Sequence, residues 1–324
     1  MQIALERIDK PDWLNNEEYR EDETNGNVVV AVIGGKGGIG KSTLSFYMAA
    51  LAADDHDVAL VDMDLPSANL TKALLLKTEK SFVDFERIPE GIKAGDVVCA
   101  QKMEKVHGIH FLPGVTRMSK EARNKVETNV NLARKLVNNL SNSFSLTFFD
   151  LGVPSNDLHY EILRLATHVV CVTDESRVGV QASNDILKDL EKFVRIKHKT
   201  KYIINAVEEK KKTNHFNVLI NYPILGTVLY QPQVKKVTDT MQYETFLSSN
   251  NKYLEEIREV TKIFNQDSPE NFLSFYQHQE PKAFHREVPQ PKEPTPDETP
   301  LFDLDLEYEE EKSFWKRLFS RKKK

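Results

Sequence analysis

Residues 34–43 form the stretch of the chain whose residue types have the clearest chemistry. They read G-G-K-G-G-I-G-K-S-T and contain the pattern G-x-x-x-x-G-K-S. Glycines at these positions let the backbone curl so that several N–H groups point toward one polyphosphate. The ammonium of Lys41 would reach the β- and γ-phosphates, and the hydroxyl of Ser42 would hold Mg²⁺. We therefore predict a nucleotide site formed by Gly35, Lys36, Gly37, Gly38, Ile39, Gly40, Lys41, Ser42 and Thr43.

The segments on either side of this stretch have the patterns of a strand and a helix. Residues 27–33 read N-V-V-V-A-V-I, an apolar β-branched run typical of a buried strand. Residues 44–53 are good helix formers and contain no proline. The alternative is a glycine turn without a ligand, which would not need a strand before it and a helix after it. A phosphate site does need them, because the N-terminus of the helix adds a partial positive charge.

Three aspartates come at the ends of predicted strands. Asp62 and Asp64 lie two residues apart on an extended segment, so both side chains can point along one side of a site. Asp150 ends a second strand, near residues 145–150. The carboxyl ends of parallel strands meet at the edge where open α/β sheets bind ligands. We predict that Asp150 binds Mg²⁺ through water; the alternative is a carboxylate that caps the next helix.

The motifs together resemble those of the MinD/ParA family of ATPases. Lys36, in K-G-G-I-G-K-S-T, matches the additional lysine of the family's deviant Walker A motif. Residues 58–70 are similar to its D-x-D-x-x-x-x-N-L motif, and residues 146–152 resemble its Walker B strand. Later core strands are matched at 169–173, 202–205 and 223–228, so that the resemblance covers about residues 27–265.

The resemblance implies a fold and a set of residue roles. The fold is α/β, a doubly wound and mostly parallel sheet of the SIMIBI/MinD type of P-loop NTPase. By resemblance, Lys36 reaches across an ATP-dependent homodimer to the phosphates of the other subunit; the alternative is a solvated loop lysine. Asp64 would orient the attacking water and Asp62 would lie near the metal, although Asp64 could instead belong to an Asx-type turn. Asn205 would contact adenine, with a capping asparagine as the alternative.

These roles define the predicted site. ATP and Mg²⁺ are the expected ligands. The expected catalytic residues are Lys36, Lys41 and Asp64, and the expected metal ligands are Ser42, Asp62 and Asp150.

One segment departs from the family's pattern. Residues 151–154 read L-G-V-P, where MinD proteins typically have S-P-A-G. In the family this segment responds to the γ-phosphate, so nucleotide binding is a firmer prediction than switching or stimulation by a partner. We expect ATP hydrolysis that is slow without a partner.

Composition limits the class of protein. The 324 residues are 40% hydrophobic and 29% charged, which suits a soluble globular protein. The sequence shows no secretory signal and no apolar run of the roughly 20 residues that span a bilayer. We expect Cys99 and Cys171 to be reduced thiols in a cytosolic protein, since they form no CxxC pair and supply no iron–sulfur ligand set. The net charge of −5 argues against extensive coating of nucleic acid.

The chain is predicted to have four parts. Residues 1–26 are a charged leader without the D-Q-A-x-x-L motif of flagellar-number ATPases, and 27–265 are the ATPase domain. Residues 266–311 are a disordered linker, Pro-rich and then acidic, and 312–324 are a basic amphipathic tail. Within the domain, strands are expected near 28–33, 58–62, 109–112, 145–150, 168–173, 201–205 and 224–228, and helices near 42–53, 119–140, 157–166, 178–195, 233–240 and 251–265.

The tail has the composition of a membrane-surface helix. Phe314, Trp315, Leu318 and Phe319 fall on one helical face, and basic residues fill the rest. It resembles the C-terminal membrane-targeting sequence of MinD-type ATPases. The alternatives are a solubilising tail or a peptide for a protein partner. The acidic residues within 297–311 could mask the tail or repel anionic lipid, and both possibilities stay open.

These observations predict a cytoplasmic ATPase that lies peripherally on the inner face of the cytoplasmic membrane. It would bind ATP, dimerise, hold anionic membrane through 312–324, and release on hydrolysis, positioning a division, flagellar or polar apparatus. An activator or cargo protein is expected, and nucleic acid is not. The alternatives are a nucleotide-dependent scaffold with little hydrolysis and a ParA-type DNA or cargo partitioning ATPase.

Overall fold

A single sheet organises the residues that the structure, a computed structural model, describes: 27–65, 67–76, 80–87, 103–208, 219–240 and 242–265. All of them belong to one compact unit. The predicted leader, linker and tail, and Cys99, lie outside the described residues. Cys171 is buried and free, as predicted.

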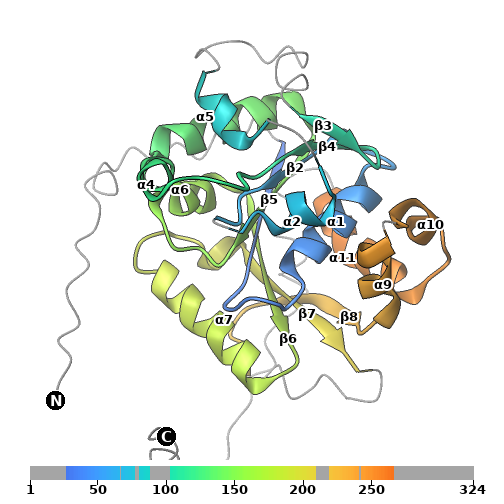
Figure 1. Cartoon of the computed structure of the whole chain (residues 1–324). Coiled ribbons are helices and arrows are strands. Elements are labelled where there is room, and N and C mark those ends of the chain that lie inside the picture. Colours follow the sequence, from blue (N-terminus) through green and yellow to red (C-terminus); the bar gives the residue numbers. More distant parts are fainter. Residues whose placement is uncertain are drawn as a thin grey trace, which may run out of the picture. The chain divides into compact units, whose positions relative to one another are not determined.

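Within the described residues the sheet has eight strands in the order β3-β4-β2-β5-β1-β6-β7-β8 (Figure 1). Every neighbouring pair is parallel except β3 and β4, which are antiparallel. The strands are β1 Val28–Ile33, β2 Val58–Asp62, β3 Glu104–Val106, β4 Ile109–Leu112, β5 Leu146–Gly152, β6 His168–Asp174, β7 Thr200–Val207 and β8 Ile224–Leu229. The predicted doubly wound α/β fold is confirmed, and all seven predicted strands are present.

The strand β3 was not predicted. It has only three residues, too few for an alternating pattern to be recognised. Its connection to β4 is a two-residue turn in which His107 (φ 48°) and Gly108 (φ 83°) both adopt the left-handed conformation that tight hairpins require.

Helices and short 3₁₀ turns connect the strands. The α-helices are α1 Lys41–Ala52, α2 Asn69–Ala73, α4 Lys120–Glu127, α5 Val130–Ser143, α6 Asp157–Leu165, α7 Arg177–Leu190, α9 Pro232–Thr240, α10 Tyr243–Leu247 and α11 Lys252–Asn265; the 3₁₀ turns are η2 Phe82–Arg87 and η3 Lys197–Lys199. Four of these, α2, α10, η2 and η3, were not predicted, since none is long enough to show a helical period. The predicted helix 178–195 ends earlier, at Leu190.

The prediction of one helix over 119–140 is wrong, because two helices occupy this region. The Ser119 side chain accepts a hydrogen bond from Ala122 N and caps α4. The Asn129 side chain accepts one from Leu132 N (3.0 Å) and starts α5 afresh. Asparagine is a strong N-cap residue, so its side chain favours a new start over continuation of the earlier helix.

Helices cover both faces of the sheet (Figure 1). Alternate residues of β1 separate the two layers: Val29 packs with the layer that contains α5, α6 and α7, and Val30 packs with α1, α10 and α11. Because both faces are buried, a central strand such as β1, V-V-V-A-V-I, is continuously apolar rather than alternating. Within the described residues, no helix is both long and apolar enough to cross a membrane.

The strand order brings the predicted site residues to one edge. Strand β5 lies between β1 and β2, and Asp62 is directly opposite Asp150 in the β2–β5 pairing. The loop that follows β1 begins at this same carboxyl edge and leads into α1.

Candidate nucleotide-binding site

The glycine-rich loop between β1 and α1 is held by backbone contacts from other strands and helices. Gly34 N donates a hydrogen bond to Gly152 O (3.1 Å), which joins the loop to the end of β5. A Cβ atom on Gly35 would lie 2.1 Å from the carbonyl carbon of Ala182, so only glycine fits where α7 presses against the loop. Gly40 (φ 86°) begins α1 without a side-chain cap. The first N–H groups of α1 therefore remain available to an anion.

Lys41 is folded back into this loop. The residue is only 7% exposed, and its Nζ donates a hydrogen bond to Lys36 O (2.7 Å). Burial lowers the pKa of Lys41, and the nearby Asp150 and Asp64 carboxylates oppose that shift. A largely desolvated cation thus lies between the loop and the strand-end aspartates.

Asp150 is a fully buried carboxyl group that lacks a normal partner. Neither of its oxygens makes a hydrogen bond of good geometry within the described residues. Burial, and then the Asp62 charge, raise the pKa of Asp150 to about 7, while the adjacent Ser42 hydroxyl lowers it. A buried carboxylate without partners is unfavourable by several kcal/mol and calls for a ligand or a catalytic explanation.

The oxygen atoms of Asp150 and Ser42 are donors of the type that Mg²⁺ prefers. Among the described residues, no group of three or more His, Cys, Asp or Glu side chains could hold a metal ion alone. Mg²⁺ usually takes one or two protein ligands and completes its shell with phosphate oxygens and water. The residues present therefore fit a magnesium–nucleotide complex better than a metal site of the protein alone.

Asp62 is also buried, but its oxygens are engaged. Its Oδ2 accepts hydrogen bonds from Thr71 N (2.8 Å) and Thr71 Oγ1 (2.7 Å), and its Oδ1 accepts one from Asp64 N (3.3 Å). Burial raises the pKa of Asp62 to about 6, and the hydrogen bonds from Thr71 oppose the rise. Asp62 thus holds the turn from β2 into α2. Its place near the metal stays a prediction. Thr71 was not predicted to belong to the site.

Asp64 is half-buried and faces the end of β5. Its Oδ2 accepts a hydrogen bond from Asn69 Nδ2 (2.8 Å), which gives the asparagine of the D-x-D-x-x-x-x-N-L motif a physical role. A Cβ atom on Gly152 (φ 66°) would lie 2.3 Å from Asp64 Oδ1. The glycine within L-G-V-P therefore makes room for the Asp64 carboxylate.

Lys36 lies on the outer side of the loop and is not freely solvated. Its Nζ is 2.7 Å from Asp174 Oδ2 and donates to Ser176 Oγ (3.4 Å), with a third of the side chain exposed. Partial burial alone would raise the pKa of Asp174, but the hydrogen bonds from Lys36 and Ser176 lower it. Ser176 is also the N-cap of α7, since its Oγ accepts from Gly179 N (2.9 Å). Asp174 and Ser176 were not predicted.

Asn205 reaches the loop from β7. Its Nδ2 donates a hydrogen bond to Ile39 O (2.8 Å), and a Cβ atom on Gly40 would lie 2.3 Å from the same nitrogen. Asn205 thus supports the loop. Its contact with adenine stays a prediction.

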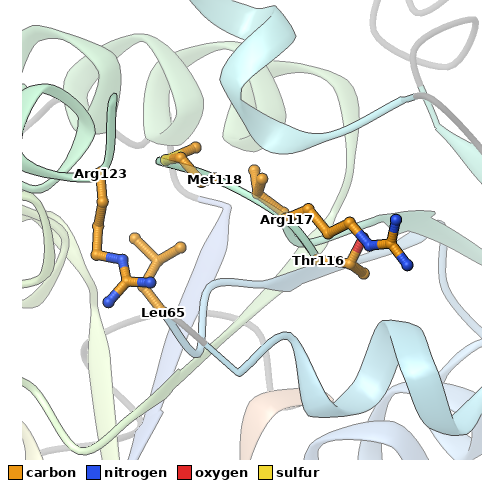
Figure 2. A pocket seen from close by; sticks show the side chains of 6 residues that line it. Leu65, Thr116, Arg117, Met118 and Arg123 are labelled. Atoms are coloured by element: carbon orange, nitrogen blue, oxygen red, sulfur yellow. The ribbon is translucent and has the colours of Figure 1, made fainter. Parts of the chain in front are cut away.

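A cavity of about 250 Å³ is lined by none of the predicted site residues. Figure 2 shows the two arginine side chains and the apolar side chains of Leu65 and Met118 around it; its lining is Leu65, Val115, Thr116, Arg117, Met118 and Arg123. The predicted phosphate site is instead the loop itself, where backbone N–H groups rather than a deep hollow would hold the ligand.

Comparisons with known proteins agree with this geometry. The model of the CobQ/CobB/MinD/ParA nucleotide-binding domain family matches residues 30–244. An uncharacterised ATP-binding protein of Methanocaldococcus jannaschii is 21% identical over 256 residues, covering 74% of this chain and 99% of that protein.

Two solved structures share the fold. A ParA family ATPase from Chlorobium tepidum has a TM-score of 0.62 at 14% identity, over 72% of this chain and 98% of that one. The septum site-determining protein MinD of Pyrococcus horikoshii, solved with Mg-ADP, has a TM-score of 0.55 at 15% identity, over 74% of this chain and 96% of that one.

Proposed function

Because the chain belongs to the CobQ/CobB/MinD/ParA nucleotide-binding family, we propose that it is an ATP hydrolase acting at the carboxyl edge of β1, β2 and β5. The observation that carries this proposal is the fully buried Asp150 carboxylate beside Ser42 and Lys41, whose oxygens make no hydrogen bond of good geometry within the described part of the chain. A nucleotide with its metal supplies the missing partners. The solved C. tepidum relative is a ParA family ATPase, and the solved P. horikoshii relative carries Mg-ADP.

The residues divide the work of hydrolysis. Lys41 would exchange its hydrogen bond to Lys36 O for the phosphates, and the uncapped start of α1 would bind them through N–H groups. Ser42 and Asp150 would hold Mg²⁺, which when bound neutralises charge on the β- and γ-phosphates. Asp64, held by Asn69, would orient the attacking water. The basal rate is expected to be slow, because the L-G-V-P segment departs from the family's switch sequence.

ATP-dependent dimerisation and membrane cycling are the further parts of the proposal. Lys36 is partly exposed, and the partners of its side chain among the described residues are Asp174 and Ser176 near the surface, so it could exchange them for a nucleotide on a second copy. A polyphosphate carries enough charge to attract cations from two subunits. Two copies of the basic tail 312–324 on one dimer would bind anionic lipid far more tightly than one copy. The cycle would position cellular machinery through an unidentified cargo or activator.

The L-G-V-P segment also supports a second candidate function, a nucleotide-dependent scaffold with little turnover. Phosphate release by the purified full chain separates the two. The hydrolase proposal predicts release with Mg-ATP that is lost in Lys41→Ala, while nucleotide binding without release would favour the scaffold. Absence of both binding and release would contradict the two functions together.

Membrane cycling is tested by co-sedimentation with vesicles that contain phosphatidylglycerol. The full chain should pellet with ATP but not ADP, the chain without 312–324 should stay in solution, and Asp64→Ala should pellet persistently with ATP. Vesicles of phosphatidylcholine alone are the control for charge. Equal pelleting of all three proteins regardless of nucleotide would reject the membrane switch. Salt-sensitive binding to duplex DNA would instead favour the ParA-type partitioning reading.

A further inference from the structure

A buried histidine on α6 contacts the backbone between Asp62, the last residue of β2, and Asp64. His159 is fully buried, and its Nε2 lies 3.0 Å from the carbonyl oxygen of Met63. Because a carbonyl oxygen only accepts, Nε2 must carry the proton in this hydrogen bond. Burial lowers the pKa of His159 to about 4, so the ring is neutral at physiological pH. Its Nδ1 is buried and has no hydrogen-bond partner among the described residues.

The peptide groups of Met63 are held from both sides. Met63 N donates a hydrogen bond to Asp150 O (2.9 Å). Its carbonyl accepts from His159 and also from Leu65 N (2.8 Å). The bond from Leu65 closes a three-residue turn whose central residue is Asp64. His159 therefore anchors the carbonyl on which the turn around Asp64 closes.

The backbone of His159 is linked to the L-G-V-P segment, which departs from the family's pattern. The backbone N–H of His159 donates to Asn156 Oδ1 (2.9 Å), which caps α6. Residues 152–156 connect this cap to β5, and Gly152 lies against the Asp64 carboxylate. A shift of this connection would move the start of α6, and with it the ring that holds Met63 O.

Simple filling of the core does not account for a histidine here. An unpaired buried nitrogen costs about 1–3 kcal/mol, and an apolar side chain of similar volume would avoid that loss. What an apolar side chain could not supply is a rigid donor aimed at Met63 O.

We propose that His159 is a positioning residue that fixes the turn around Asp64 and couples it to residues 152–156. The inference rests on the proposed ATP hydrolysis and deepens it, by naming the contact through which the β5–α6 connection controls Asp64. His159 itself does not touch the reacting atoms.

Two substitutions separate positioning from packing. His159→Leu fills the buried space with an apolar side chain but removes the hydrogen-bond donor. His159→Gln keeps a side-chain N–H donor at a similar distance from the backbone. The control is Ile162→Val, since Ile162 is equally buried on the same helix and makes only core contacts. Each full-length variant is assayed for phosphate release from Mg-ATP, for binding of a non-hydrolysable ATP analogue, and for thermal unfolding.

We expect His159→Leu to lower kcat about 10- to 100-fold with analogue affinity within about threefold, the scale of losing a positioning contact. His159→Gln should recover at least a third of the wild-type kcat, and Ile162→Val should retain it. If His159→Leu does not fold, the comparison of His159→Gln with Ile162→Val, and the ¹⁵N shifts of the wild-type ring, decide.

A wild-type ring that is cationic, or protonated on Nδ1, would overturn the inference. So would a kcat for His159→Leu within twofold of wild type, or equal losses in His159→Leu and His159→Gln. A wild-type chain that released no phosphate would reject the hydrolase proposal itself, and this positioning role with it.

Discussion

Asp150 on β5 and Glu161 on α6 are both fully buried carboxylates, and the chain treats them in opposite ways. Glu161 accepts hydrogen bonds from Arg134 Nε (2.7 Å), Arg164 Nε (2.8 Å) and an Arg164 terminal nitrogen (2.7 Å). Neither oxygen of Asp150 makes a hydrogen bond of good geometry among the described residues, although the Ser42 hydroxyl lies beside it. The contrast separates a carboxylate that joins two helices from one whose missing partners would come from a ligand.

The difference between the two carboxylates indicates that the fold is less stable at the candidate site, where charged groups are kept for a ligand. The buried Glu161 carboxylate is paired with two guanidinium groups, as a buried charge requires. At the edge of β1, β2 and β5, Asp62 and Asp150 have raised pKa values and Lys41 has a lowered one, all chiefly through burial. Buried groups with perturbed pKa values that converge at one edge are typical of functional sites.

Of the substitutions that test the comparison between Asp150 and Glu161, Asp150→Asn should have the largest effect. Asp150→Asn should lower phosphate release by at least about 100-fold, the scale of removing one electrostatic contact to transition-state charge. The nucleotide-free variant should be as stable as wild type or more stable, because an unpaired buried carboxyl has been removed. Phosphate assays and chemical denaturation measure the two effects. A less stable variant that kept its activity would reverse the assignment.

Glu161→Gln should show the opposite behaviour. Loss of the charged acceptor weakens its arginine contacts, and we expect about 2–3 kcal/mol less stability from hydrogen bonds to a charged group. The kcat per folded molecule should not change. The control is Asp189→Asn on α7, whose pair with Lys192 is 62% exposed on both sides and should contribute less than about 0.5 kcal/mol. Equal effects of the two substitutions would show that burial does not distinguish them.

Lowering the pH should destabilise the folded chain through the buried, neutral His159. Its folded pKa of about 4 lies below the roughly 6.5 of an unfolded histidine, so the unfolded state binds the extra proton as the pH falls from 7.5 to 5. This proton uptake should remove about 1–2 kcal/mol of stability from wild type and nothing from His159→Leu. Asp62 and Asp150 act in the other direction, because their folded pKa values are raised, so the difference between the two proteins is the quantity to measure. A difference that stayed constant with pH would mean that the ring is charged or accessible.

The smallest effect concerns the outer lysine of the loop. Asp174→Asn should release Lys36 from its pair and strengthen ATP-dependent self-association about threefold to fivefold, since a partly exposed pair is worth up to about 1 kcal/mol. Analytical ultracentrifugation with and without Mg-ATP measures this, with Lys36→Ala as the control that should not associate. Weaker association of Asp174→Asn would show that Asp174 supports the dimer instead of restraining Lys36.

Local patterns in the sequence were enough to predict most of the framework. The β-branched runs gave seven strands, and the loop with Asp62 and Asp150 followed because parallel strands end at one edge. The boundary at Asn129 was missed because a capping side chain outweighed a continuous helical pattern.

The contacts that complete the site join segments far apart in the chain. His159 meets Met63 across 96 residues, and Lys36 meets Ser176 across 140. No local pattern of polar residues distinguishes such partners from other surface or capping side chains, and only the folded arrangement identifies them.

The most direct test of the central claim is the gain in thermal stability on adding Mg²⁺ with a non-hydrolysable ATP analogue. At about 100 times the dissociation constant, binding should stabilise the folded wild-type chain by about 2.7 kcal/mol. Glu161→Gln should start from a lower midpoint and gain the same amount, whereas Asp150→Asn should lose the part of the gain that needs Mg²⁺. No gain in the wild-type chain, or an equal magnesium-dependent gain in all three proteins, would contradict the account.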